Sequence, residues 1–201
     1  FDNCTSLISI TIPDSVMTIG DSAFFNCSSL TSVTIPDSVT SIGNGAFFHC
    51  SSITGVTIPD SVTTIEKDAF RKCSNLISVT IPDSITTIGD LAFSSCVSLT
   101  SVTIPDSVTT IGLGAFSECD KLESVYCQAT IPPLGGNKML GINASDRKIY
   151  VPTESVDAYK SAEYWSEYAD AIIAYDFENG VVVEPEVSAN NEIRYTATAK
   201  V

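Results

Sequence analysis

The chain has 201 residues, and its 24 Asp and Glu residues outnumber its 10 Lys and Arg residues to give a formal net charge of −14. The length is that of one or two domains. Nucleic acids and anionic membranes are polyanions that are bound through clustered basic residues, so the charge argues against both as partners. No apolar run approaches the roughly 20 residues of a membrane-spanning helix, so we expect no membrane insertion in this segment.

The cysteines reveal an internal repeat. Six of the seven lie 23 residues apart, and a period of this length indicates the stacked coils of a solenoid. The chain opens at Phe1 in the middle of this repeat, without a charged and then apolar leader, so we expect any secretion signal to lie upstream. The repeated cysteines are Cys4, Cys27, Cys50, Cys73, Cys96 and Cys119.

The second coil shows what each part of the repeat is expected to form. Residues 32–35 alternate polar and apolar side chains, which predicts a short strand with one face inward. Pro36 ends this strand because it cannot donate a hydrogen bond, and Pro-Asp-Ser is typical of a turn. Val39 and Ile42 point inward from a second extended segment. Ala46 and Phe47 are expected in one helical turn.

Stacking such coils places equivalent residues about 4.8 Å apart and produces a parallel sheet. Because neighbouring coils supply each other's burial, we expect the stability to belong to the array, with both ends in need of cover. One column of threonines should face solvent on this sheet, formed by Thr11, Thr34, Thr57, Thr80 and Thr103.

The repeat L-x-x-V-T-I-P-D-S-V-T-x-I-G-x-x-A-F-x-x-C resembles the BspA-like, treponemal-type leucine-rich repeat over residues 1–127. The resemblance implies an α/β solenoid, with a parallel β-sheet on one face, short second extended segments and helical turns on the other, and a C-terminal cap. It also implies a secreted or surface-displayed bacterial protein that acts in adhesion. An extracellular protein or glycan would then be its partner.

Residues 128–177 are expected to form atypical coils and a cap. Ile149 lies 24 residues beyond Val125, which predicts that the sheet continues with strands near 148–151 and 171–175. Between these strands, Thr153 is expected to cap a helix over 154–162. The bulky cover of this cap would come from Tyr159, Trp165 and Tyr168. The segment also resembles the unit that closes arrays of this family.

Residues 178–201 are expected to form a linker and the start of a further module. Asn179-Gly180 predicts a turn, and Glu184-Pro185-Glu186 is typical of a linker. The alternation over 193–199 predicts an edge strand.

The cysteines allow two interpretations. Neighbouring coils bring them close enough for disulfides, but side chains in a stacked column point in parallel, whereas a bridge needs converging Cβ atoms. We therefore expect buried free thiols that act as small apolar side chains, with partial bridging or metal binding as alternatives. Cys127 favours this interpretation, because it takes a strand position that isoleucine fills in earlier coils.

The sequence does not predict an enzyme, a cofactor or a resident metal. His49 is the only histidine, and no pattern pairs it with a nucleophile. The Pro-Asp-Ser aspartates are expected to satisfy local backbone groups, with weak Ca²⁺ binding along their column as an alternative. Asp-Ser-Val also resembles an O-glycosylation acceptor of some gut bacteria, although the turn explains it. These aspartates are Asp14, Asp37, Asp60, Asp83 and Asp106.

Two exposed groups are candidate partner-binding residues. Tyr126 and Tyr150, beside Thr103, would form a platform for a sugar or a protein because rigid aromatic side chains give contact area at low entropic cost. The alternatives are a cross-strand pair that steadies the cap, or a pair covered by the loop of residues 135–141.

The second group lies at the turns. Phe25 and Phe48 occupy equivalent positions of adjacent coils, and Arg71 follows on the next, so an aromatic pair leads to a cation. This group would anchor a partner, be covered by a neighbouring molecule, or be incidental.

These observations favour a non-enzymatic surface or secreted module for adhesion or for protein or glycan binding. The alternative is a structural spacer that presents neighbouring modules, which the uniform threonine column favours because recognition faces are more varied. A carboxylate-based hydrolase is the third hypothesis.

Overall fold

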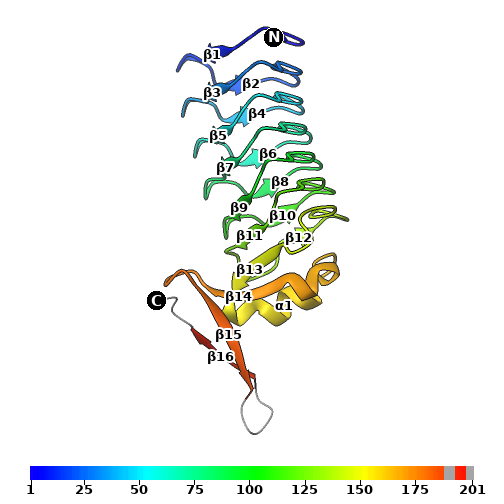
Figure 1. The fold of residues 1–201 in the computed structure, drawn as a ribbon. Helices are drawn as coiled ribbons and strands as arrows, with labels where there is room; N and C mark the ends of the chain where they lie inside the picture. The colour runs from blue at the N-terminus through cyan, green and yellow to red at the C-terminus, as the bar shows by residue number, and fades with distance from the viewer. Residues whose placement is uncertain (188–192, 198–201) are drawn as a thin grey trace.

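The computed structural model describes residues 1–187 and 193–197, and it is a solenoid of stacked coils closed by a helical cap (Figure 1). This confirms the predicted solenoid. Each coil contributes one strand to a first row on one face, and these strands run parallel through β14. The first row consists of β1 (Ser9–Thr11), β3 (Ser32–Thr34), β5 (Gly55–Thr57), β7 (Ser78–Thr80), β9 (Ser101–Ile104), β11 (Ser124–Cys127), β13 (Lys148–Pro152) and β14 (Ile172–Asp176).

The register of the first row follows the repeat. Val102 pairs with Val125 at a spacing of 23 residues, and Val125 pairs with Ile149 at 24. The sixth coil, which runs from β11 to β13, therefore holds one extra residue, yet the inward side chains stay in line. Ile172 follows Ile149 in the same register, which confirms both of the strands predicted beyond residue 127.

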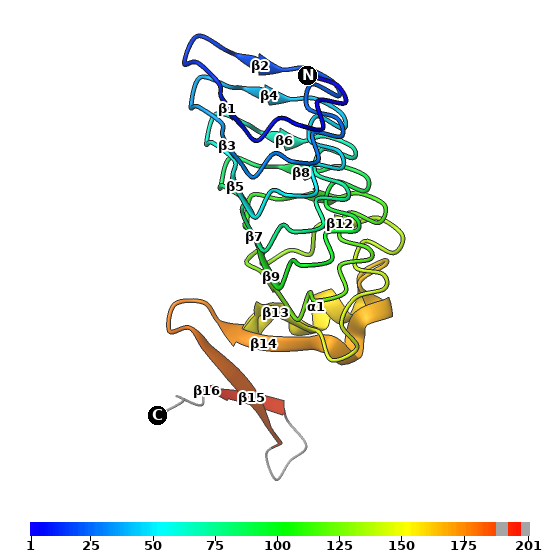
Figure 2. The same ribbon diagram turned by 45° about the horizontal axis from the view of Figure 1, so that its top comes forward.

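Shorter strands form a second row, which Figure 2 shows beside the first. Each contributes one inward isoleucine, except that Gly135 takes this place in the sixth coil. The space there is filled by Met139, whose sulfur lies 2.8 Å from where a Cβ of residue 135 would be. The second row consists of β2 (Thr18–Ile19), β4 (Ser41–Ile42), β6 (Thr64–Ile65), β8 (Thr87–Ile88), β10 (Thr110–Ile111) and β12 (Leu134–Gly135).

The segment around Ala46 and Phe47 is not the helical turn that the sequence suggested. It is a succession of tight turns, in which Ala46 N donates to Gly43 O (3.2 Å) and Phe48 N to Gly45 O (3.0 Å). Gly45 and His49 have φ angles of +58° and +60°. A left-handed residue at each end of so short a segment prevents a right-handed helix from forming.

Phenylalanine and cysteine ladders form the centre of the core. The rings of Phe24, Phe47, Phe70, Phe93 and Phe116 stack along the array at centroid distances of 5.1–5.4 Å. Each repeat cysteine from Cys27 onward donates its Sγ hydrogen to the carbonyl of the phenylalanine 26 residues earlier, at 3.0–3.3 Å. All seven cysteines are free, and six of them are buried, which confirms the packing interpretation.

The cap differs from its prediction in how it begins. A 3₁₀ turn, η1 (Thr153–Ser155), precedes α1 (Val156–Ser161), and no side-chain hydrogen bond caps either. Thr153 is therefore not a helix cap, because the chain enters the 3₁₀ turn directly from Pro152 and Thr153 already belongs to that turn. Ser155 instead donates its hydroxyl to Thr130 O at 2.8 Å.

The bulky residues of the cap lie where the sequence placed them. Trp165 and Tyr159 are fully buried with their rings edge to face. Trp165 Nε1 donates to Pro133 O (2.7 Å), and the Tyr159 hydroxyl donates to Ala129 O (2.9 Å). Tyr168 belongs to η2 (Ser166–Ala171). Its ring is half-buried beneath the guanidinium of Arg147. These contacts tie the cap to residues 129–133 and seal the core.

A β-hairpin follows the cap. β15 (Val181–Val187) pairs antiparallel with β14 and with β16 (Ile193–Ala197), which confirms the predicted edge strand as far as residue 197; residues 198 and 199 lie outside the described part. Glu184-Pro185-Glu186 belongs to β15 and is not a linker. Beyond Val182 this strand pairs with β16 alone, and proline is tolerated at such an edge. In the described part of the chain, no helix has the length and apolar character needed to cross a membrane.

Candidate partner-binding surfaces

The outward face of the first row is uniform until it reaches its last coils. The column threonines, Thr11 to Thr103, are all exposed. Thr103 pairs in register with Tyr126, and Tyr126 with Tyr150, so the structure brings these three predicted residues together. The column thus changes from a short polar side chain to an aromatic one within a single step.

The two tyrosines form part of a larger aromatic cluster. Their rings are stacked, with centroids 4.6 Å apart and planes 14° from parallel. Tyr175 of β14 packs against both, at 5.4 Å from Tyr126 and 5.3 Å from Tyr150, and Phe177 packs edge-on against Tyr175 at 4.9 Å. All four side chains are half-buried. The pair is therefore neither isolated nor fully covered.

The loop of residues 135–141 does not cover the tyrosines, contrary to one of the alternatives. Met139 O accepts a hydrogen bond from Phe116 N (2.8 Å), and Met139 and Leu140 are buried in the core. The 24-residue spacing of the sixth coil places this loop at the phenylalanine turns, away from the first row.

A groove of about 350 Å³ lies between the aromatic cluster and the start of β15. We call it the tyrosine groove; it is lined by Tyr126, Tyr150, Tyr175, Gly180, Val182 and Glu184. Burial, together with the phenols of Tyr126 and Tyr150, raises the pKa of Tyr175, so its hydroxyl stays a donor. Glu184 is exposed at this groove.

Sequence reasoning missed Tyr175 and Glu184. Tyr175 lies in the predicted strand 171–175, two residues after Ile173, which pairs with Tyr150, so the alternation of a strand could have placed it on the same face. Glu184 reaches the groove only because β15 folds back on β14. The interpretation of residues 184–186 as a linker concealed this position.

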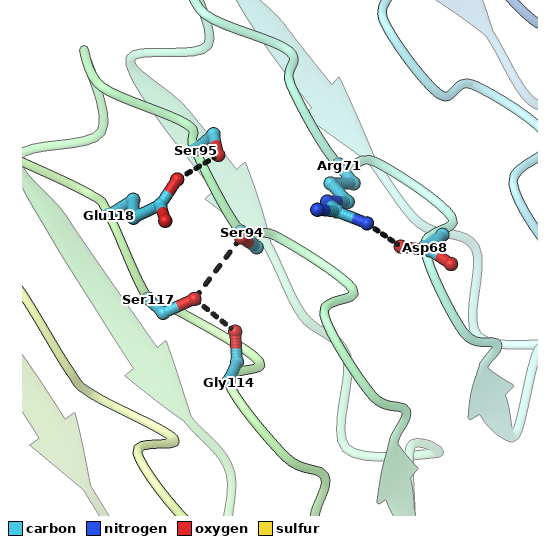
Figure 3. A network of polar contacts seen from close by, with 7 residues as sticks. All are labelled: Asp68, Arg71, Ser94, Ser95, Gly114, Ser117 and Glu118. Atoms are coloured by element: carbon cyan, nitrogen blue, oxygen red, sulfur yellow. Dashed lines mark hydrogen bonds and ion pairs between the residues drawn. The ribbon is translucent and has the colours of Figure 1, made fainter.

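The second candidate group lies on the turns. We call this edge, where the turns of successive coils stack, the turn ridge. Phe25 and Phe48 stack with centroids 5.0 Å apart, and Arg71 and Lys72 each place their charge 5.7 Å from the Phe48 ring. Arg71 also pairs with Asp68 at 3.1 Å (Figure 3). The predicted aromatic-to-cation sequence is present, and both rings are half-buried.

Farther along the ridge the side chains become small. Ser117 donates to Ser94 Oγ (3.1 Å) or to Gly114 O (2.9 Å), and Ser95 donates to Glu118 (2.8 Å), as Figure 3 shows. A depression of about 370 Å³ follows. Ile142 on its wall is 73% exposed and has a φ of +54°, which is unusual for a β-branched residue.

His49 and the Pro-Asp-Ser aspartates are the residues that were considered for catalysis or metal binding. His49 is exposed and meets the edge of Phe48, with centroids 6.4 Å apart. Among the described residues, no group of three or more His, Cys, Asp or Glu side chains is arranged to hold a metal ion.

The Pro-Asp-Ser turns are held by serine and not by aspartate. Ser84 and Ser107, for example, donate to Val62 O and Ile85 O of the preceding coil at 2.6 and 2.8 Å. The aspartates are exposed, because each turn already closes through a backbone hydrogen bond to the proline carbonyl and needs no acceptor from them. Because these hydroxyls are engaged, the turn explains the Asp-Ser-Val motif better than glycosylation does.

Comparison with known families agrees with this geometry. The model of the BspA type leucine-rich repeat region matches residues 1–140 in six copies. The chain belongs to this family. No curated protein matches the chain.

Solved structures of bacterial leucine-rich repeat proteins are similar to the chain. A protein from Bacteroides ovatus is 34% identical with a TM-score of 0.64, over 72% of this chain and 37% of its own. The Treponema pallidum leucine-rich repeat protein is 28% identical with a TM-score of 0.59, over 81% and 82%. One from Eubacterium ventriosum is 26% identical with a TM-score of 0.54, over 68% and 43%. The chain therefore spans well under half of the first and third proteins.

Proposed function

We propose that the chain is a non-enzymatic repeat module, displayed on the cell surface or secreted, that binds a protein or glycan partner through the tyrosine groove. The observation that carries this proposal is the single step from Thr103 to Tyr126 on an otherwise uniform face, directly beside a groove. A repeat that serves only to stack has no need of this change.

The aromatic cluster has properties expected of a contact surface. Tyrosines expose an apolar ring and a polar hydroxyl, and their two side-chain torsions cost little entropy when they are fixed by a partner. The packing of Tyr126, Tyr150 and Tyr175 against one another already restricts these rings before a partner arrives. Binding then loses less conformational freedom than it would with isolated side chains.

Placement outside the cell is part of the proposal. It is supported by the membership in this repeat family, and the buried cysteines are compatible with it. Burial raises the pKa of the Cys50 and Cys119 thiols to about 12, so they remain protonated and inaccessible to oxidants. The fold can therefore persist in an oxidising compartment without disulfides.

A spacer is the second candidate function. It is favoured by the five exposed threonines from Thr11 to Thr103, which offer no varied recognition surface. In this case the aromatic cluster would serve only to fasten β15 to the cap.

An array of extracellular-matrix proteins and glycans tests the proposal. Binding by the chain that is lost in Tyr126→Ala and kept in Phe48→Ala supports the tyrosine groove. Binding lost only in Phe48→Ala moves the site to the turn ridge, and silence across the array supports the spacer. Hydrolysis of any probe that survives His49→Ala would contradict the non-enzymatic assignment.

A further inference from the structure

The tyrosine groove opens on the side of the aromatic cluster that faces Tyr175 and β15. The 4.6 Å between the Tyr126 and Tyr150 centroids is close to the spacing of adjacent strands, so the rings stand face to face across β11 and β13. Tyr175 packs against both rings with its plane strongly inclined, at 66° to Tyr126 and 59° to Tyr150. Thr103, on the other side of Tyr126, does not line the groove, so a ligand of the groove meets the cluster from the side of Tyr175.

Hydrogen-bonding groups line the groove together with these rings. The hydroxyls of Tyr126, Tyr150 and Tyr175 can donate and accept, and Glu184 offers a carboxylate that accepts. Asp176 is already engaged, because its oxygens accept hydrogen bonds from Glu178 N (3.0 Å), Asn179 N (2.9 Å) and Asn179 Nδ2 (2.7 Å). Glu184 is therefore the carboxylate that is left to serve a ligand.

The neighbouring strands make a β-addition peptide a poor fit. Extended peptides commonly bind by adding a strand to an open sheet edge. At the groove, β15 pairs with the last two residues of β14, Val182 with Tyr175 and Val181 with Asp176. At this end of β14 we therefore expect a ligand of the groove to be held by side chains.

The charge of the protein and the size of the groove narrow the class of ligand further. The net charge of −14, with Glu184 in the groove itself, opposes sialylated, sulfated or uronic-acid sugars. A volume of about 350 Å³ lies at the small end of ligand pockets, as one or two sugar rings require. A pyranose ring has an apolar C–H face that packs on an aromatic ring and a rim of hydroxyls that donate to carboxylates.

We infer that the tyrosine groove binds an uncharged glycan, with a sugar ring packed against the tyrosine rings that line the groove and its hydroxyls bonded to Glu184. This inference rests on the proposed function and names the ligand class of the same site. The tyrosine rings supply most of the affinity, and the Glu184 carboxylate orients the sugar ring.

Saturation-transfer NMR on the unmodified chain tests the inference directly. The probes are mannobiose, lactose and chitobiose, with 3′-sialyllactose as the charged counterpart of lactose. Irradiating the tyrosine ring protons should transfer signal to the ring C–H protons of at least one neutral disaccharide and not to sialyllactose. No transfer to any neutral probe, or stronger transfer to sialyllactose, overturns the inference.

Variants then locate the contact. Tyr126→Ala should weaken binding of the responding disaccharide about tenfold or more, and Glu184→Gln by about three- to tenfold. Phe48→Ala, on the turn ridge, should leave affinity unchanged, and thermal melting checks that each variant is folded. Equal affinity in Tyr126→Ala contradicts the inference.

One pattern separates this inference from the proposed function. If a matrix protein such as collagen or laminin binds, depends on Tyr126, and is not displaced by neutral disaccharides, the glycan inference is wrong and the proposed function stands. If no protein or glycan probe depends on Tyr126, both are wrong.

Discussion

The coils up to β9 and the coils after it share one strand register but differ in the side chains that they carry. Before β9, each coil presents the same threonine outward and the same phenylalanine and cysteine inward. After it, Leu140 takes the place of the stacked phenylalanine and Asn143 that of the cysteine, while tyrosines replace the outward threonine. The strand register nevertheless continues through Ile149 and Ile172.

This comparison separates two kinds of position. Inward space has to stay filled, because each coil is packed between its neighbours, so a smaller inward residue such as Gly135 is compensated by a nearby side chain, here Met139. Outward positions are free of that constraint, so a change there reflects either a new neighbour or a partner. The aromatic cluster has both a neighbour, β15, and an open groove beside it.

The largest effect is expected from an inward change in the regular coils. Phe70 is fully buried and stacked on both sides, so Phe70→Ala should lower the free energy of unfolding by about 3–5 kcal/mol. Phe48→Ala, at a half-buried ridge position, should cost less than half as much. Urea denaturation followed by circular dichroism measures both, and equal losses would remove the distinction between inward and outward positions.

Alkaline pH should weaken the cysteine ladder. Burial raises the pKa of Cys50 and Cys119 to about 12 and that of Cys73 and Cys96 well above its ordinary value. Below about pH 8.5 each thiol is neutral whether folded or unfolded; above it only the unfolded thiol ionises. Stability should therefore fall as pH rises from about 8.5 toward 12, by up to about 1.4 kcal/mol per thiol and pH unit.

Thiol titration checks the same account. In denaturant without reductant, all seven cysteines should react with a thiol reagent, whereas the buried ones should be protected in the folded chain at pH 8. Five or fewer reactive thiols in denaturant would indicate bridging and contradict the packing role. A melting temperature that does not change between pH 8 and pH 10.5 would contradict the pH dependence.

A moderate effect is expected at the Pro-Asp-Ser turns. Ser84 donates to Val62 O in the preceding coil, so Ser84→Ala should cost about 1 kcal/mol. Ser15 has the same place in the first coil and is exposed, so Ser15→Ala is the matched control and should cost close to nothing. If the two variants melt alike, hydrogen bonding between coils is not what fixes serine at this position.

The smallest expected effect is a gain in stability at Ile142. Ile142 stands exposed with a φ of +54°, where equivalent positions hold Asn26, His49 or Lys72. Asparagine tolerates this backbone better than isoleucine, so Ile142→Asn should stabilise the chain by up to about 1 kcal/mol. A lower melting temperature would show that Ile142 contributes contacts that the fold needs.

The sequence predicted the parts of the fold that repeat. A fixed spacing transfers the interpretation of one coil to all others, so the strands, the buried cysteines and the continuation to Ile172 followed from a single pattern. The turns around the stacked phenylalanines were misjudged, because their left-handed end residues include Ser22, Asp68 and Lys72 in the coils of Phe24 and Phe70, and these carry no glycine signal.

The candidate site was only partly predictable. Tyr126 and Tyr150 followed from the column, since the register fixes which face each residue takes. Tyr175 and Glu184 depend on a hairpin that doubles back on β14, and the repeat does not encode it. The start of the cap was missed for a similar reason, because Pro152 leads straight into a 3₁₀ turn that contains Thr153.

Restoring the repeat at the groove tests the central claim that departures from the repeat carry the function. In the double variant Tyr126→Thr and Tyr150→Thr, the threonine column continues from Thr103 to the cap. We measure its affinity for the partner bound by the parent chain, together with its melting curve. The account predicts a folded solenoid, destabilised by no more than about 1–3 kcal/mol from the lost aromatic contacts, that no longer binds. A folded variant that binds as well as the parent would contradict it.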